Sequence, residues 1–239
     1  MLEIPRAKHV FRVILNIMIQ RKRKMLNDLE KLLDTPLIAS GKCPVIRNGV
    51  YLQGITKKIS EKYHGHRFTG AKKKTKEKSS KIIGLRVHGE LQRIAESDRV
   101  MNPHPWTIQA LRLLFGKGLQ LVAAEVPIAW KSIGTRIDLL AISPLSKGII
   151  LISLKTGYRR GPSPRSTHLA KPFQHLRASD QALDEIQIMA EKAITRQGYG
   201  ILFENAYILE VPEGKLRSAP CWTNDFQKQD DLLNIIMSK

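Results

Sequence analysis

Apolar residues are unevenly patterned along the chain, and from residue 81 onward their spacing predicts well-defined elements. They recur at helical spacing in "IIGLRVHGELQRIAESD" and "PWTIQALRLLFGKG", and then run together or alternate in three short segments typical of strands. A helical pattern, a strand pattern and a short last helix follow. The predicted elements are helices over 82–98 and 105–118, strands over 119–130, 135–143 and 147–155, a helix over 178–197, a strand over 205–211 and a helix over 230–237.

The order of these elements predicts an α/β protein. The run "KGIILISLK" is almost wholly apolar, as expected for a central strand that is covered on both faces. The turn "SPLSKG" is short, so strands 135–143 and 147–155 are expected to pair antiparallel. The strand–helix–strand segment at the end then predicts a mixed sheet flanked by helices.

The first third of the chain has a different pattern. Residues 6–33 predict one helix or a pair of helices, because five apolar residues fall on one face: Val10, Val13, Ile14, Ile17 and Met18. Residues 41–80 show little periodicity, and "HRFTGAKKKTKEKSSK" is typical of a flexible basic linker. We therefore divide the chain into a basic helical region with a linker (1–80), a core (81–215) and a tail with a short helix (216–239).

Charge favours a polyanionic partner. The net charge is +19, and residues 1–88 hold 21 of the 40 Lys and Arg but only 6 of the 21 Asp and Glu. Such a balance indicates nucleic acid first and an anionic membrane surface second. The residues expected to contact phosphates are Arg21, Lys22, Arg23, Lys24, Lys72, Lys73 and Lys74 in two basic runs, and Arg159, Arg160 and Arg165 in the loop after strand 147–155.

The remaining composition concerns the cellular setting. Two distant cysteines, Cys43 and Cys221, favour a reducing compartment and exclude a disulfide scaffold or a four-cysteine metal site within one chain. The early apolar run "VILNIMI" is too short to span a membrane. An intracellular protein is expected, with the nucleus favoured by the basic runs. A mitochondrial transit peptide is disfavoured by Glu3 and by the absence of serine before Ser40.

Two charged residues stand where burial is expected. Asp138 lies in strand 135–143 and Lys155 ends strand 147–155, and a buried charge requires a partner, a metal or a substrate. Ser153 shares a face with Lys155 because side chains two apart on a strand point the same way. In an antiparallel hairpin, Asp138 comes near Lys155. A carboxylate holding Mg²⁺ or Mn²⁺ beside a lysine suits phosphodiester hydrolysis.

At this point the sequence resembles the PD-(D/E)XK nuclease superfamily, and within it the RecB-like exonuclease branch. The likeness spans about residues 81–212 through "GLRVHGELQR", "AAEVPI", "GTRIDLLAI", "ILISLKTGY" and "DQALDEIQ". It implies a restriction-endonuclease-like core of α-β-β-β-α-β order behind the basic N-terminal extension, and a metal-dependent deoxyribonuclease of exonuclease type. The residues that it implies are Asp138 as the main metal ligand, the Leu154 carbonyl as a backbone ligand, Glu90 or His88 completing the shell, Lys155 as the catalytic lysine and Gln181 as a substrate-positioning residue.

The departure from the family is Ser153, which stands where an acid is expected before Leu154 and Lys155. A hydroxyl is a weaker metal ligand than a carboxylate, so another acid has to replace it. Candidates are Glu125 on the neighbouring strand, or an acid of the following helix, namely Asp180, Asp184 or Glu185. The third alternative is a nuclease fold that has lost catalysis.

Structural roles compete with these assignments. Asp138 is also compatible with an ion pair to Arg136 or Lys131, and Glu125 with a purely structural acid. His88 and Glu90 are two apart on a helix, so at most one of them is expected to point inward.

The rival functions are a catalytically silent scaffold that binds nucleic acid, and a packaging or assembly factor. In the latter, the basic front binds nucleic acid and the body binds protein. A protein partner bound through the N-terminal helical region is a separate expectation. The sequence leaves the oligomeric state open, and DNA is favoured over RNA without being established by any motif.

Overall fold

The computed structural model describes residues 20–63 apart from 21, 41 and 42, residues 74–157 apart from 97–98 and 145–146, and residues 168–238. A helix occupies 22–33 within the first of these segments. The other helices are α2 (Ile55–Tyr63), α3 (Lys74–Ala95), α4 (Pro105–Gly116), α5 (Asp180–Tyr199) and α6 (Phe226–Met237), with a short 3₁₀ turn at Cys221–Asn224. The strands are β1 (Leu37–Ser40), β2 (Cys43–Arg47), β3 (Val50–Tyr51), β4 (Gln53–Gly54), β5 (Gln120–Trp130), β6 (Ile133–Ile142), β7 (Ile150–Lys155), β8 (Asn205–Glu210) and β9 (Lys215–Ser218).

The main sheet is mixed, as the sequence predicts. Strands β5, β6 and β7 form an antiparallel meander, β8 runs parallel to β7 after the α5 crossover, and β9 closes the edge antiparallel to β8. The two residues of β4 pair with the first residues of β6. Strands β1, β2 and β3 make a small separate antiparallel sheet. The chain is thus an α/β protein whose central strand, β7, lies between β6 and β8.

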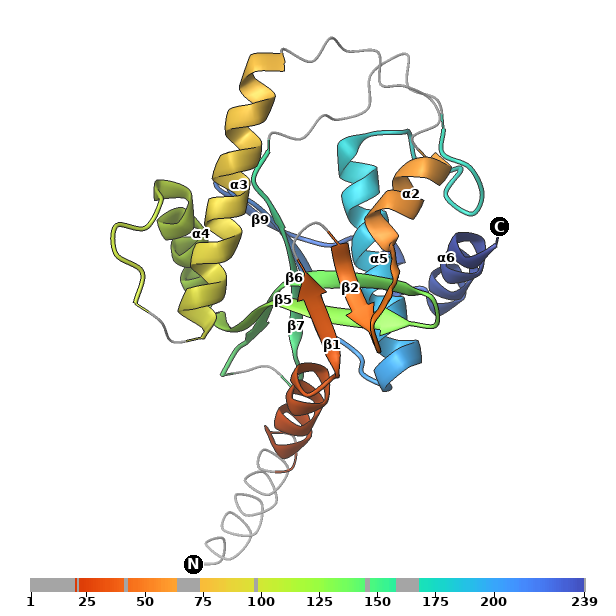
Figure 1. Cartoon of the computed structure of the whole chain (residues 1–239), viewed down its shortest axis with the longest axis horizontal. Coiled ribbons are helices and arrows are strands. Elements are labelled where there is room, and N and C mark those ends of the chain that lie inside the picture. The colour runs from red at the N-terminus through yellow and green to blue at the C-terminus, as the bar shows by residue number, and fades with distance from the viewer. Residues whose placement is uncertain are drawn as a thin grey trace, which may run out of the picture.

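Helices cover both faces of this sheet (Figure 1). The first core lies between the sheet and α2, α5 and α6, and the second core lies between the opposite face and α3 and α4. Side chains of β7 point alternately to the two faces of the sheet, so Leu151 packs in the first core and Ile150, Ile152 and Leu154 pack in the second. All six of its residues are buried, which confirms the prediction of a central strand covered on both faces.

The region predicted as a linker differs from that expectation. Helix α3 begins at Lys74, inside the predicted linker, and residues 43–63 carry three strands and α2. Ile55, Ile59 and Tyr63 of α2 are buried in the first core, so the described part of 1–80 is built into the globular body. Ile55, Ile59 and Tyr63 recur every four residues, so a helical pattern was present, but it extends over only nine residues.

The C-terminal segment packs more tightly than a tail suggests. The 216–239 segment contributes most of β9, and α6 buries Leu232, Leu233 and Ile236 in the first core. Asp225 caps α6 by accepting a hydrogen bond from the Lys228 amide at 3.1 Å. The predicted helix over 6–33 is present from residue 22, and its earlier part, with all five apolar positions, lies outside the described residues.

No helix in the described part of the chain is both long enough and apolar enough to cross a bilayer.

Candidate functional site

The β6–β7 pairing sets the position of Asp138. The strands are antiparallel with Leu139 opposite Ile152, which places Asp138 across from Ser153. Its Oδ2 accepts a hydrogen bond from the Ser153 hydroxyl at 3.1 Å and another from the Leu154 amide at 2.7 Å. The expected pairing of the two strands is confirmed, and two donors from β7 compensate the charge of Asp138, which is half-buried rather than buried.

Glu125 lies beside Asp138 on the neighbouring strand. The β5–β6 ladder pairs Ala124 with Leu139 on one side of this position and Val126 with Ile137 on the other. Glu125 itself has φ of +53°, a left-handed conformation that is uncommon for a residue with a side chain. Such strain persists only where surrounding contacts enforce it, and it clusters at functional sites.

Side chains from α3 and β6 hold the Glu125 carboxylate. Its Oε1 lies 2.6 Å from His88 Nδ1 and its Oε2 lies 3.1 Å from Arg136 Nη1. Arg136 therefore pairs with Glu125 and not with Asp138, the partner that a structural role for Asp138 predicted. The arginine fixes the orientation of the glutamate that the strained backbone presents.

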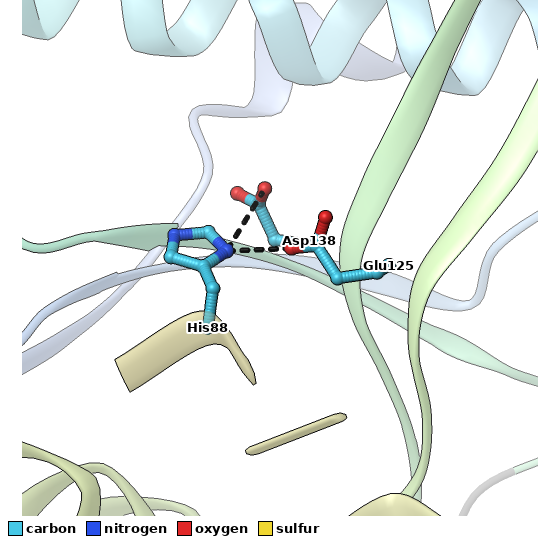
Figure 2. Close-up of side chains that lie close together, drawn as sticks. All are labelled: His88, Glu125 and Asp138. Carbon is cyan, nitrogen blue, oxygen red and sulfur yellow. Dashed lines mark hydrogen bonds and ion pairs between the residues drawn. The ribbon is translucent and has the colours of Figure 1, made fainter. Parts of the chain in front are cut away.

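His88 completes a group of three possible ligands. It projects from α3 toward the two carboxylates of the sheet, as Figure 2 shows, and its Nδ1 lies 4.0 Å from Asp138 Oδ1. One ligand atom from each of the three residues lies within 4.8 Å of the other two. Burial lowers the pKa of His88, but the hydrogen bond to Glu125 and the charge of Asp138 outweigh it, so the pKa is raised.

A glycine one turn before His88 brings α3 close to the sheet. A Cβ on Gly84 would lie 2.5 Å from Thr156 Oγ1, immediately after Lys155. A larger residue at 84 would therefore push the helix away from the end of β7. Since His88 follows Gly84 by one turn, the same close approach positions the imidazole over β5 and β6.

Lys155 is compensated from α5. Its buried ammonium lies 3.2 Å from Asp184 Oδ1 and donates to Gln187 Oε1 at 2.9 Å. Asp184 and Gln187 are three residues apart, so they share one face of the helix. Among the helix acids that the sequence suggested, Asp184 is thus the one that reaches Lys155.

Glu191, one turn after Gln187, is the acid that sequence reasoning missed. It is fully buried and its Oε1 accepts a hydrogen bond from Gln187 Nε2 at 2.8 Å. Its Oε2 has no hydrogen-bond partner among the described residues. Burial first, and then the charge of Asp138, raise the pKa of Glu191 to about 8, although Gln187 and Lys155 act in the opposite direction. An acid inside the apolar run "IQIMAEKAI" was the available signal.

Glu90, proposed above as a metal ligand, occupies another place. Its carboxylate accepts hydrogen bonds from the His104 amide at 2.8 Å, Thr107 Oγ1 at 2.5 Å and Arg86 Nε at 2.6 Å. These contacts join α3 to the first turn of α4. Of the pair two apart on α3, His88 faces the carboxylates and Glu90 does not, because their directions on the helix differ by about 200°.

The remaining predicted site residues on α5 lie apart from the cluster or at its margin. Gln181 is half-buried in the first turn of α5, and Gln187, almost two turns later, makes the contact to Lys155. Glu185 is bound by Arg217 Nη1 at 3.1 Å. Asp180 is the first residue of the helix.

The predicted phosphate contacts are only partly within the described residues. Lys22, Arg23 and Lys24 are exposed on the helix over 22–33, and Lys74 is the first residue of α3. Arg21, Lys72 and Lys73 of the basic runs, and Arg159, Arg160 and Arg165 of the loop after β7, lie outside them. The structure therefore leaves most of that interface as a prediction.

Neither a family model nor a curated protein matches the chain.

Proposed function

We propose that this protein is a divalent-metal-dependent nuclease of the PD-(D/E)XK type that hydrolyses phosphodiester bonds in DNA. The observation that carries the proposal is the convergence of His88, Glu125 and Asp138 within 4.8 Å, beside a strand that bears Lys155. The element order α3-β5-β6-β7-α5-β8 supports a restriction-endonuclease-like core. An exonuclease-like mode of action is proposed from the resemblance to the RecB-like branch.

The donor set fits a divalent cation. Two carboxylates and one imidazole provide oxygen and nitrogen ligands, and carboxylate oxygens suit Mg²⁺ and Mn²⁺. The buried Glu191 carboxyl adds a third acid near Asp138, whose charge helps to raise its pKa, and its Oε2 has no hydrogen-bond partner among the described residues. We propose that Asp138, Glu125 and His88 hold the ion and that Glu191 replaces the acid missing at Ser153.

The protein groups around the cluster have distinct roles in this reaction. The ion, when bound, polarises the phosphate and lowers the pKa of its water. Lys155 is oriented by Asp184 and Gln187, which places an ammonium group where it offsets the charge of the transition state. Ser153 and the Leu154 amide orient the Asp138 carboxylate, and Arg136 does the same for Glu125.

Two observations favour a second candidate function, a silent nuclease fold that binds nucleic acid. Ser153, which stands where the family has an acid, donates a hydrogen bond to Asp138. Lys155 is already paired with Asp184. Both features are also compatible with a stable structural network that needs no metal.

A cleavage assay distinguishes the two candidates. Linear duplex and single-stranded DNA are incubated with the whole chain in Mn²⁺ or in Mg²⁺. Wild type is compared with Asp138→Asn, Lys155→Ala and Ser153→Glu, and Lys147→Ala serves as a lysine control because Lys147 is exposed. Binding of Mn²⁺ is followed in parallel by isothermal titration calorimetry.

We expect cleavage by wild type and by Lys147→Ala, and a loss of at least about 100-fold in Lys155→Ala. Asp138→Asn should lose Mn²⁺ binding together with cleavage. Activity that appears only in Ser153→Glu would identify a silenced nuclease. Absence of both Mn²⁺ binding and cleavage in every variant would refute the enzyme proposal.

A further inference from the structure

A hollow lies at the end of β5, away from the cluster of His88, Glu125 and Asp138. It has a volume of about 680 Å³ and is formed where four elements meet: the end of the helix over 22–33, the β2–β3 turn, the β5–β6 turn and the end of α5. Pro36, Leu37, Ala129 and Trp130 provide apolar lining. Three cations, Lys31, Arg47 and Lys131, also line it, and no acid does.

None of these cations is ion-paired to a carboxylate among the described residues. Lys31 Nζ donates to the Tyr199 carbonyl at 3.1 Å, and Arg47 Nη1 donates to the Lys131 carbonyl over a long 3.4 Å. The Lys131 ammonium lies 4.2 Å from the centroid of the Trp130 ring. Their positive charges therefore converge without an anion to offset them, which favours binding of an anionic ligand.

The backbone at Lys131 supports a role for its side chain. Trp130 pairs with Ile133, so Lys131 and Ser132 form a two-residue hairpin turn, and Lys131 has φ of +52°. Turns of this kind favour Gly, Asn or Asp, which adopt positive φ at little strain. The neighbouring β2–β3 turn follows that rule with Asn48 and Gly49. A lysine in the equivalent conformation is strained, and strain of this kind is typical of functional positions.

We propose that this hollow, which we call the basic hollow, binds the phosphate backbone of a nucleic-acid strand through Lys31, Arg47 and Lys131. The choice of nucleic acid as the polyanion rests on the proposed function. Glu125 and Trp130 lie five positions apart on β5, which corresponds to about 16 Å at 3.3 Å per residue. A duplex strand that reaches both places spans about five nucleotides at 3.4 Å each.

The test measures DNA binding by the whole chain in EDTA, where no cleavage occurs. Fluorescence anisotropy with a labelled duplex of about 20 base pairs is recorded at salt concentrations from about 50 to 200 mM. The double variant Arg47→Gln/Lys131→Gln is compared with wild type. Its matched control, Arg112→Gln/Lys117→Gln, removes the same two charge types from exposed positions at α4 and just after it.

Counterion release sets the expected size of the effect. The slope of log K against log salt is negative, and each lost phosphate contact makes it shallower by about 0.9. The slope of the double variant should therefore be shallower than that of wild type by about 1.8. With an unchanged affinity at 1 M salt, binding at 0.1 M falls about 60-fold. The control pair should change affinity by less than about threefold, since neither residue lies in the basic hollow.

A single variant separates binding from folding. Lys131→Gly relieves the positive φ, so its melting temperature should rise, whereas its DNA affinity at 0.1 M salt should fall about eightfold. Lys131→Gly with unchanged affinity, or a control pair that loses as much affinity as the double variant, would overturn the assignment. So would a mononucleotide that binds the basic hollow as tightly as the duplex.

The outcome is independent of catalysis. If wild type never cleaves DNA but the double variant still loses affinity and salt dependence, the basic hollow stands and the nuclease proposal fails. If wild type cleaves and the double variant binds DNA with the affinity and slope of wild type, the nuclease proposal stands and the basic hollow fails.

Discussion

Replacing Glu191 with glutamine should stabilise the protein, and increasingly so as the pH rises. The pKa of Glu191 is raised to about 8 in the folded chain, against 4.5 for an ordinary glutamate. Between these values the unfolded chain has lost the proton and the folded chain keeps it. The free energy of unfolding contributed by this group therefore falls as the pH rises from about 4.5 to 8, and is constant above that range.

The size of the effect follows from the shift. At 1.36 kcal/mol per pKa unit, the upper limit is on the order of 5 kcal/mol at pH above 8, and coupling to Asp138 makes about 2–4 kcal/mol a fair expectation. Glu191→Gln retains an oxygen that accepts from Gln187 Nε2 and carries no charge. The variant should thus equal wild type near pH 4.5 and exceed it by that amount near pH 8.5.

Urea unfolding in EDTA at about pH 5, 7 and 8.5 measures this difference. The control is Glu96→Gln, an exposed position just after α3, which should change the free energy of unfolding by less than about 0.5 kcal/mol at every pH. A difference between Glu191→Gln and wild type that does not grow with pH would refute the reasoning. Added Mn²⁺ should stabilise wild type at pH 8.5 more than the variant, because an ion bound to the folded state alone raises its stability.

Three further predictions concern helix α3 and what it holds. Gly84→Ala should destabilise the protein by about 1–3 kcal/mol, because the new Cβ meets Thr156 Oγ1; unchanged urea unfolding would contradict this contact. Gly89→Ala on the same helix meets nothing within 4 Å and should instead stabilise by about 0.5–1 kcal/mol, measured in the same way. Burial raises the pKa of Glu90, but the hydrogen bonds from Thr107, Arg86 and His104 outweigh burial, so the pKa is lowered overall. The stability that Glu90 adds to the folded chain is therefore present above about pH 4.5 and is lost as the pH falls. Glu90→Gln should therefore weaken the acid dependence of unfolding, and an unchanged dependence would count against this role.

Much of the central part of the fold could be predicted from local patterns. The unbroken apolar run over β7 marked a strand buried on both faces, and the short turn before it indicated antiparallel pairing with β6. The elements missed were short ones. The Asn-Gly turn between Arg47 and Val50 is a strong hairpin signal, but its strands have few residues and little alternation.

The candidate site divides in the same way. Asp138, Ser153 and Lys155 were predictable because strand pairing and the two-residue period relate them directly. The sequence did not predict which of His88 and Glu90 faces the sheet, since either choice suits an amphipathic helix. Glu191 was missed because its partners are set by where α5 crosses the sheet, which no local spacing encodes.

The sequence by itself determined the local choices: the order of helices and strands from α3 to β8, the pairing of β6 with β7, and a charge of +19 that favours a polyanion. Only the tertiary structure decided which distant side chains meet. The close approach of α3 at Gly84 brings His88 to Glu125 and Asp138, and the packing of α5 in the first core brings Asp184 to Lys155 and buries Glu191. These contacts join residues separated by tens of positions, so their geometry follows from how whole elements pack and not from the periodicity of any one of them.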